Sequence, residues 1–316
     1  MLELRLFGAG QASYNGQPLD GFPTQQSYLL LCYLLLNPHA HYRERLAAVF
    51  WADHPAHTSR KHLSQTLWRL RNSLQSADVP VENYLTITKE KISFNREDPT
   101  IYSLDIEKFE ETVTRYQDIT GQQLAAEQAT ELEDVVNLYV GDLLEGVYDD
   151  WCLYDRERLN LHYLDALGKL MVFHEKHQSY EQGLAAGERI LNFDNTRERV
   201  HQQMMRLYWL AGNRSAALSQ YKRCVQILGE ELGVDPMKET TQLYQSMQHN
   251  QFNPNIDTVQ PSSTALSPLV RSDESLQRLA DQSLQRLNNL QKIVDETSEE
   301  LRSLERLIRA TLLGTE

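Results

Sequence analysis

The N-terminal residues alternate between apolar and polar positions, and the pattern then changes to a helical period. The segment LELRLFG (2–8) places its leucines on one face of an extended strand, and Asn15-Gly16 is a dipeptide typical of a hairpin turn. From Thr24, a suitable N-cap residue, apolar positions recur at helical spacing until Asn37-Pro38 ends the segment. The pattern predicts a short β-sheet followed by a buried helix.

Two further helices and a hairpin are predicted next. The second helix spans Arg43 to Trp51. The third lies in TSRKHLSQTLWRLRNSL (58–74), where leucines recur at i, i+4, i+7 and i+11. This inward stripe consists of Leu63, Leu67, Leu70 and Leu74. Two alternating segments, LTIT (85–88) and KISF (91–94), then flank a short turn. A small sheet, three helices and a hairpin in this order predict a winged helix-turn-helix domain.

The third predicted helix is basic although the protein is acidic. The formal net charge is −13, yet the segment 58–74 carries four Arg/Lys and no acid, and the acid-free window extends from His54 to Ala77. Residues 1–100 hold ten Lys/Arg against nine Asp/Glu, whereas residues 101–316 hold twenty-one against thirty-five. Because electrostatic effects are screened within ~10 Å, a local basic face can bind a polyanion on an acidic protein. A solvated helix that lacks acids by chance is the alternative.

Polar and basic side chains occupy the face of this helix opposite its leucines. In helix-turn-helix proteins the recognition helix offers such a face to the major groove. The outward positions are Arg60, Lys61, Ser64, Gln65, Trp68 and Arg71, with Arg69 flanking them. In the hairpin, Thr88, Lys89 and Lys91 suit a neighbouring phosphate or the minor groove. These residues are therefore candidates for contacts with double-stranded DNA.

From Tyr102 to about His249 the pattern is helical throughout, with acidic outer faces and an internal period. SYEQGLAAGERIL aligns with NRSAALSQYKRCV at an offset of 34 residues. Pairs at this offset are Met171/Met205, Gly183/Ala217, Leu184/Leu218 and Arg189/Arg223. Thirty-four residues is the tetratricopeptide period, in which helix pairs stack and form a surface for a partner. Unrelated helices in a bundle are the alternative.

The C-terminal residues have two further patterns. Residues 249–274 are rich in Pro and Ser and have little apolar periodicity, which predicts a flexible linker. Residues 275–316 have apolar positions every seven residues, typical of a coiled coil or of a helix that docks on a partner. We expect this helix to make the protein a homo-oligomer. The residues predicted to do so are Leu276, Ala280, Leu287, Leu290, Val294, Leu301, Leu304 and Ile308.

Composition and motifs exclude several other classes of protein. No apolar run approaches the ~20 residues of a membrane helix, so no membrane segment is predicted. The three cysteines lie far apart, which indicates free thiols in a reducing cytoplasm. No phosphate-binding loop, nucleophile elbow or Cys-x-x-Cys motif occurs, so neither an enzyme nor a cofactor is predicted. The histidines between positions 39 and 62 match no common metal-ligand spacing, so no metal site is predicted.

Several segments together resemble the bacterial transcriptional activator domain proteins, typified by the antibiotic-regulatory (SARP) activators. In the first part of the chain the similar segments are LELRLFG, YLLLCYLLLNP, RERLAAVFW and SRKHLSQTLWRLRNSL. In the helical part they are LYVGDLLEGVYDDW (138–151), RERVHQQMMRLYWLAGNRSAALSQYKRC (197–224) and ELGVDPMKETTQLY (231–244). The resemblance covers residues 1–248, and it is specific because all of these segments occur together in one chain.

The resemblance implies a winged helix that binds promoter direct repeats, beside a tetratricopeptide-like domain that helps to recruit RNA polymerase. It adds Thr24 and Gln25 to the DNA candidates, since backbone N–H groups at a helix start can hold a phosphate. We therefore predict a mainly α protein with a small N-terminal β-sheet that acts in the cytoplasm as a sequence-specific DNA-binding transcription activator. The alternative is a protein-interaction scaffold whose winged helix does not read DNA. The predicted parts are a winged-helix domain (1–98), a tetratricopeptide-like activator domain (99–248), a linker (249–274) and a C-terminal heptad helix (275–316).

Overall fold

The computed structural model describes residues 1–19, 22 and 24–253. The chain divides into two units, Met1–Pro254 and Asn255–Glu316, and every element described below belongs to the first. The predicted heptad helix, with all of its predicted oligomerisation residues, and the predicted linker from residue 254 onward lie outside the described residues. In the described part of the chain, no helix is long and apolar enough to cross a bilayer.

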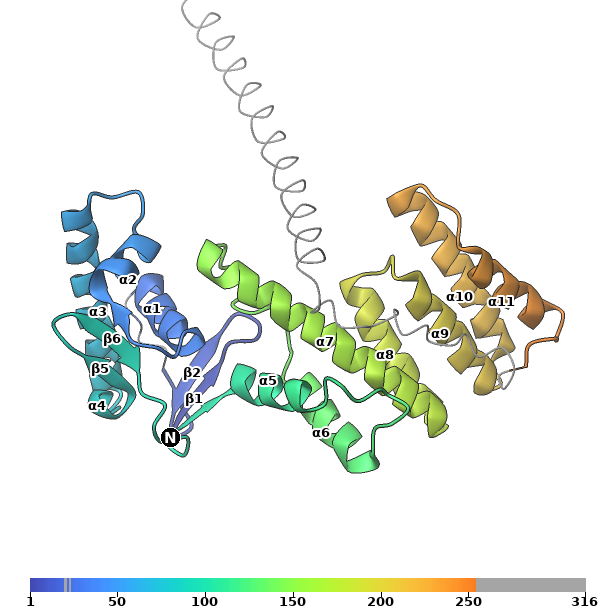
Figure 1. Ribbon diagram of the computed structural model, residues 1–316, viewed down its shortest axis with the longest axis horizontal. Coiled ribbons are helices and arrows are strands. Elements are labelled where there is room, and N and C mark those ends of the chain that lie inside the picture. The colour runs from blue at the N-terminus through green and yellow to red at the C-terminus, as the bar shows by residue number, and fades with distance from the viewer. Residues whose placement is uncertain (20–21, 23, 254–316) are drawn as a thin grey trace, which may run out of the picture. The chain divides into compact units, whose positions relative to one another are not determined.

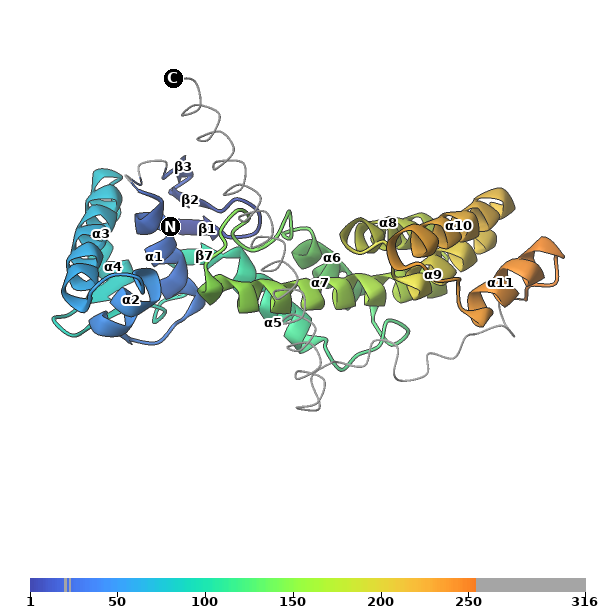
Figure 2. The same ribbon diagram turned by 90° about the horizontal axis from the view of Figure 1, so that it is seen from above.

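The N-terminal sheet has four strands in the order β3-β2-β1-β7 (Figures 1 and 2). Their bounds are β1 Leu2–Arg5, β2 Gln11–Tyr14, β3 Gln17–Pro18 and β7 Tyr102–Leu104. The predicted hairpin turn is confirmed, since Asn15 and Gly16 have φ values of 50° and 78°, and a type I′ turn requires positive φ at both positions. Strand β7 pairs in parallel with β1, with Leu4 opposite Leu104. The interpretation of the chain as helical from Tyr102 is therefore wrong for these three residues.

The winged helix-turn-helix is confirmed by three helices and a second, three-stranded sheet. The helices are α1 Gln25–Leu36, α2 Arg43–Phe50 and α3 Ala56–Ser76, and the short α4 Val81–Tyr84 follows them. The sheet has the order β4-β6-β5, formed by β4 His41–Tyr42, β5 Leu85–Ile87 and β6 Lys91–Phe94. The four leucines of the predicted stripe on α3 are at most 4% exposed. Their burial fixes which face of α3 is turned outward.

The helical half consists of antiparallel helices that contact one another in sequence order (Figures 1 and 2). They are α5 Asp105–Arg115, α6 Ala126–Val136, α7 Asp150–Lys176, α8 Tyr180–Phe193, α9 Glu198–Leu210, α10 Arg214–Ile227, the π-helix η1 Leu228–Leu232 and α11 Lys238–Gln248. The start and end of α8 recur 34 residues later as the start and end of α10. The left-handed residue before α8, Gln178, likewise recurs as Gly212. The structure therefore confirms helical repeats with the predicted period.

Several contacts join the helical half to the winged helix. The carboxylate of Asp105 accepts hydrogen bonds from the backbone N–H groups of Leu6 (2.9 Å) and Phe7 (3.1 Å). The backbone N–H of Leu144 donates to the carbonyl of Leu6 (2.9 Å), which extends the pairing at the end of β1. The ring of Trp151, in the first turn of α7, contacts residues of α1 and α2. The end of β1 and the start of α7 thus fix the junction.

Candidate nucleic-acid interface

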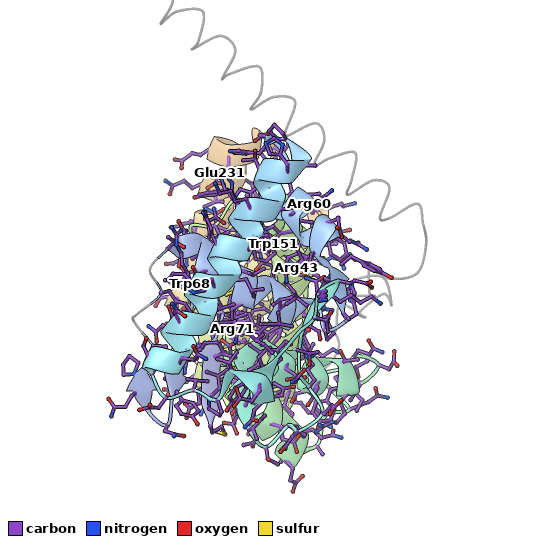
Figure 3. The ribbon with its side chains drawn as sticks, turned by 90° about the vertical axis from the view of Figure 1, so that its left-hand side faces the viewer. Arg43, Arg60, Trp68, Arg71, Trp151 and Glu231 are labelled. Atoms are coloured by element: carbon purple, nitrogen blue, oxygen red, sulfur yellow. The ribbon has the colours of Figure 1, made fainter. Side chains whose placement is uncertain are left out.

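Helix α3 presents a continuous polar face to solvent. Figure 3 looks onto this face, with Arg60, Trp68 and Arg71 along the helix and Arg43 of α2 beside it. The side chains of Arg60, Lys61, Ser64, Gln65 and Arg71 are exposed. Trp68 is 64% exposed, which makes it one of the most exposed large apolar side chains in the described residues. Arg69 is half-buried at the edge of the face, consistent with its flanking position in the sequence pattern.

Within the part of the chain that the structure describes, the cations of this face have no carboxylate partner. Among the residues that the structure describes, no ion pair involves Arg60, Lys61, Arg69 or Arg71. Arginines of the helical half, in contrast, bind carboxylates, for example Arg206 with Glu175 at 3.1 Å. The acid-free window in the sequence therefore corresponds to an uncompensated basic surface that an anionic partner would stabilise.

The β5–β6 hairpin forms the wing beside α3. The Thr88 hydroxyl accepts the backbone N–H of Lys91 (2.9 Å) and donates to the Lys91 carbonyl (3.0 Å), and these bonds close the turn. Lys89 is exposed at the tip. The Lys91 ammonium lies over the ring of Tyr42, 4.5 Å from its centroid, and Tyr42 itself is 54% exposed. The wing thus places one cation over an exposed aromatic ring and a second cation at its tip.

Arg43, at the start of α2, lies between α3 and the wing. Its guanidinium donates to the Ser64 hydroxyl on α3 (3.4 Å) and to the Thr88 carbonyl in the wing (3.3 Å). Its backbone N–H donates to the Glu90 carbonyl (2.9 Å). Sequence reasoning missed this residue because hydrophobic periodicity gives no signal for a contact 21 or 45 residues away along the chain.

Thr24 and Gln25 lie at the start of α1. Thr24 occupies the predicted N-cap position, but its hydroxyl hydrogen-bonds to the Ser27 hydroxyl (2.8 Å) instead of a backbone N–H group. Gln25 is exposed. A small depression is lined by Phe22 together with residues of the last turn of α3, so α1 begins near the C-terminal end of α3. The wing and the start of α1 therefore flank different parts of α3.

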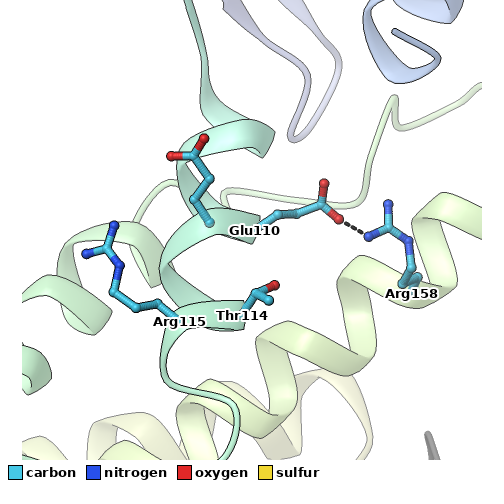
Figure 4. A pocket seen from close by; sticks show the side chains of 5 residues that line it. Glu110, Thr114, Arg115 and Arg158 are labelled. Atoms are coloured by element: carbon cyan, nitrogen blue, oxygen red, sulfur yellow. Dashed lines mark hydrogen bonds and ion pairs between the residues drawn. The ribbon is translucent and has the colours of Figure 1, made fainter. Parts of the chain in front are cut away.

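Other polar surfaces offer less to a ligand. A shallow depression on α5 and α7 is lined by Glu110, Glu111, Thr114, Arg115 and Arg158 (Figure 4). Its Arg158 is already paired with Glu110 and with Asp155.

Burial raises the pKa of the Cys32 thiol to about 12, so this thiol is a core group and not a nucleophile. Within the described residues, no cluster of three or more His, Cys, Asp or Glu side chains is placed to hold a metal ion.

Comparisons with known proteins agree with this architecture. The family model of the bacterial transcriptional activator domain matches residues 104–248. The fold is similar to that of Mycobacterium tuberculosis EmbR, solved in complex with a low-affinity phosphopeptide, with a TM-score of 0.57 and 19% sequence identity. The similarity covers 80% of this chain and 66% of the EmbR chain, so the present chain spans just under two thirds of that protein. No curated protein matches the sequence.

Proposed function

Because residues 104–248 match the bacterial transcriptional activator domain, we propose that this chain is a sequence-specific DNA-binding regulator that acts in the cytoplasm. The observation that carries the proposal is the outward face of α3. Three exposed cations, Arg60, Lys61 and Arg71, lie opposite a buried leucine stripe and have no ion-pair partner among the described residues, in a protein with net charge −13. A duplex in contact with α3 would supply the missing anions, and the base edges would meet Ser64, Gln65 and Trp68.

The proposal is tested by binding of the full chain to DNA. Oligonucleotides selected from a random pool by the purified protein would first define a binding sequence. The triple variant Arg60→Ala/Lys61→Ala/Arg69→Ala should then bind that sequence more weakly. The slope of log affinity against log salt should fall by roughly 0.9 for each phosphate that the variant no longer binds.

A matched triple variant controls for the general loss of positive charge. Lys108, Arg199 and Lys222 are exposed cations of the helical half, and no ion pair in the described part of the chain involves them. Their replacement by alanine should leave DNA affinity almost unchanged. If both triple variants bound DNA like the wild type, α3 would not be the recognition helix, and the protein-interaction scaffold would be the better description.

We further propose that the protein activates transcription from direct repeats and contacts RNA polymerase through its helical half. The end of η1 and the connector after it support this, because their apolar side chains are exposed: Leu232 (55%), Val234 (51%) and Met237 (44%). The connector is nevertheless held in place, since the Met237 N–H donates to the Glu198 carboxylate (2.6 Å). Exposed apolar side chains on a segment that is held in place are typical of protein-binding surfaces.

This second step is tested by transcription in vitro with RNA polymerase on a template that carries the selected sequence. The double variant Leu232→Ser/Val234→Ser should retain DNA affinity and lose stimulation of transcript synthesis. Equal stimulation by the wild type and the double variant would exclude this surface. No stimulation by the wild type would contradict the assignment as an activator.

A further inference from the structure

Arg43 has an unusual position for a cation on a winged helix-turn-helix domain, because it belongs to neither the recognition helix nor the wing and contacts both. Its guanidinium reaches Ser64 of α3 at 3.4 Å and the carbonyl of Thr88 at 3.3 Å. The side chain is half-buried, so its position is restricted by the elements on both sides. Figure 3 shows it beside α3, on the same side of the domain as Arg60.

The hydrogen bonds of Arg43 leave most of its donor capacity unused. A guanidinium carries five N–H donors, and here only two long, uncharged contacts are made. Glu44 follows Arg43 in the chain, and the backbone carbonyl of Glu90 accepts the Arg43 N–H (2.9 Å), but within the described residues neither carboxylate forms an ion pair with Arg43. Charge-assisted hydrogen bonds to an anion are about twice as strong as neutral ones. An anion next to Ser64 would therefore compete successfully for this group.

Ser64 explains why a cation from another helix is useful at this point. Its own hydroxyl donates back to the carbonyl of Arg60 (2.9 Å), one turn earlier in α3, so its donor is already used. Ser64 is also short and uncharged, and it lies on the exposed face of α3 one turn from both Lys61 and Trp68. The Arg43 guanidinium contacts its hydroxyl at 3.4 Å.

We propose that Arg43 is the phosphate ligand at the junction of α3 and the wing, and that it supplies from α2 the positive charge that Ser64 does not provide on the recognition helix. The inference rests on the proposed function, because it requires a duplex on α3. On binding, the guanidinium exchanges its contacts with Ser64 and Thr88 for a backbone phosphate, and its position before binding reduces the entropy cost of the exchange.

The test measures the affinity of the full chain for a short random-sequence DNA duplex by fluorescence anisotropy, since phosphate contacts do not depend on base sequence. Arg43→Gln removes the charge and retains an amide that can donate to Ser64. This variant should lower the steepness of log affinity against log salt concentration by about 0.9. When salt is raised from about 50 to 200 mM, the affinity of the wild type should therefore fall about 3.5-fold more than the affinity of the variant. Arg43→Met provides a second removal of charge in case the first variant does not fold.

Two further variants separate a phosphate ligand from a residue that only fastens the wing. Arg45 is an exposed arginine of the same helix whose neighbours include His41, and Arg45→Gln should leave the salt slope unchanged. The double variant Arg43→Gln/Ser64→Lys moves the charge to α3 and should restore the wild-type slope. A residue that only fastens the wing would not be replaced in this way.

The outcomes distinguish this inference from the proposed function. If the wild type bound the duplex, the triple alanine variant of α3 lowered the slope and Arg43→Gln kept the full slope, Arg43 would not be a phosphate ligand and the proposed function would stand. An unrestored slope in the double variant would also overturn the inference. A wild type with no affinity for the duplex would overturn the proposed function itself.

Discussion

Replacement of Asp105 removes the acceptor of three buried backbone N–H groups at the junction between the two halves of the first unit. Its Oδ1 atom accepts from Leu6 (2.9 Å) and Ile106 (2.8 Å), and its Oδ2 atom accepts from Phe7 (3.1 Å). The residue is only 7% exposed, so water does not readily replace these bonds. Burial raises the pKa of the carboxyl, and the backbone hydrogen bonds partly oppose this effect.

The magnitude follows from the number of donors that are left without an acceptor. In Asp105→Asn one oxygen becomes an NH₂ group, which leaves at least one buried N–H unpaired at a cost of about 1–3 kcal/mol. We expect a loss of roughly 2 kcal/mol in the free energy of unfolding. Asp105→Ala leaves all three N–H groups unpaired, and we expect a loss of roughly 4 kcal/mol after the gain from not burying a charge.

Urea unfolding followed by circular dichroism and by tryptophan fluorescence measures both losses. Trp151 reports on the junction, because its ring lies 5.4 Å from that of Tyr33 and 5.9 Å from that of Phe50. Asp98 is a suitable control, since it is an exposed aspartate that accepts the nearby N–H of Thr100 (2.9 Å), and Asp98→Asn should leave the unfolding midpoint almost unchanged. The reasoning is refuted if the Asn and Ala variants both unfold like the wild type, or if Asn costs more than Ala.

Three further predictions concern the repeats and the C-terminal residues. Gly212 has φ +77° and nothing within 4 Å of an added Cβ atom, so Gly212→Ala should cost about 1 kcal/mol in unfolding free energy from backbone conformation alone. Gly229 lies in equally open space without a positive φ, so Gly229→Ala should not have this cost. Burial lowers the pKa of His201, so as the pH falls the unfolded chain binds a proton before the folded chain does. The free energy of unfolding should therefore decrease as the pH falls below about 6.5, and it should decrease less steeply in His201→Gln. Deletion of residues 272–316 should lower the number of chains per particle, which light scattering gives as the measured mass divided by the chain mass, and an unchanged number would remove the predicted oligomerisation.

The elements predicted correctly from the sequence are those determined by residues that lie close together in the chain. The leucine stripe of α3 and the turn at Asn15-Gly16 depend on residues close together in the chain, and both are confirmed. The 34-residue period is also a property of neighbouring segments. Helix pairs that bury the same small residues, such as Gly183, repeat because each pair packs on the next.

The features missed by sequence reasoning are those that depend on distant partners. Strand β7 has three residues, too few for a period, and it becomes a strand because β1 offers an open edge. Arg43 differs from Arg45 only by its position on α2, and the pattern does not reveal that one of them reaches Ser64 and Thr88. Asp105 looks like an ordinary acid at a helix start, and its burial follows from the return of the chain to β1.

The parallel pairing of β1 with β7 has a consequence for biosynthesis. Strand β1 leaves the ribosome early, but the edge that pairs with β7 is covered only after Leu104 has emerged. The carbonyl of Leu6, just after β1, accepts the N–H of Leu144, which emerges later still. Until then the nascent chain exposes an unpaired strand edge, a known hazard for association between chains. A ribosome that pauses before residue 104 would therefore hold a winged helix-turn-helix whose N-terminal sheet is incomplete, and truncated chains that end before this residue should be prone to aggregation.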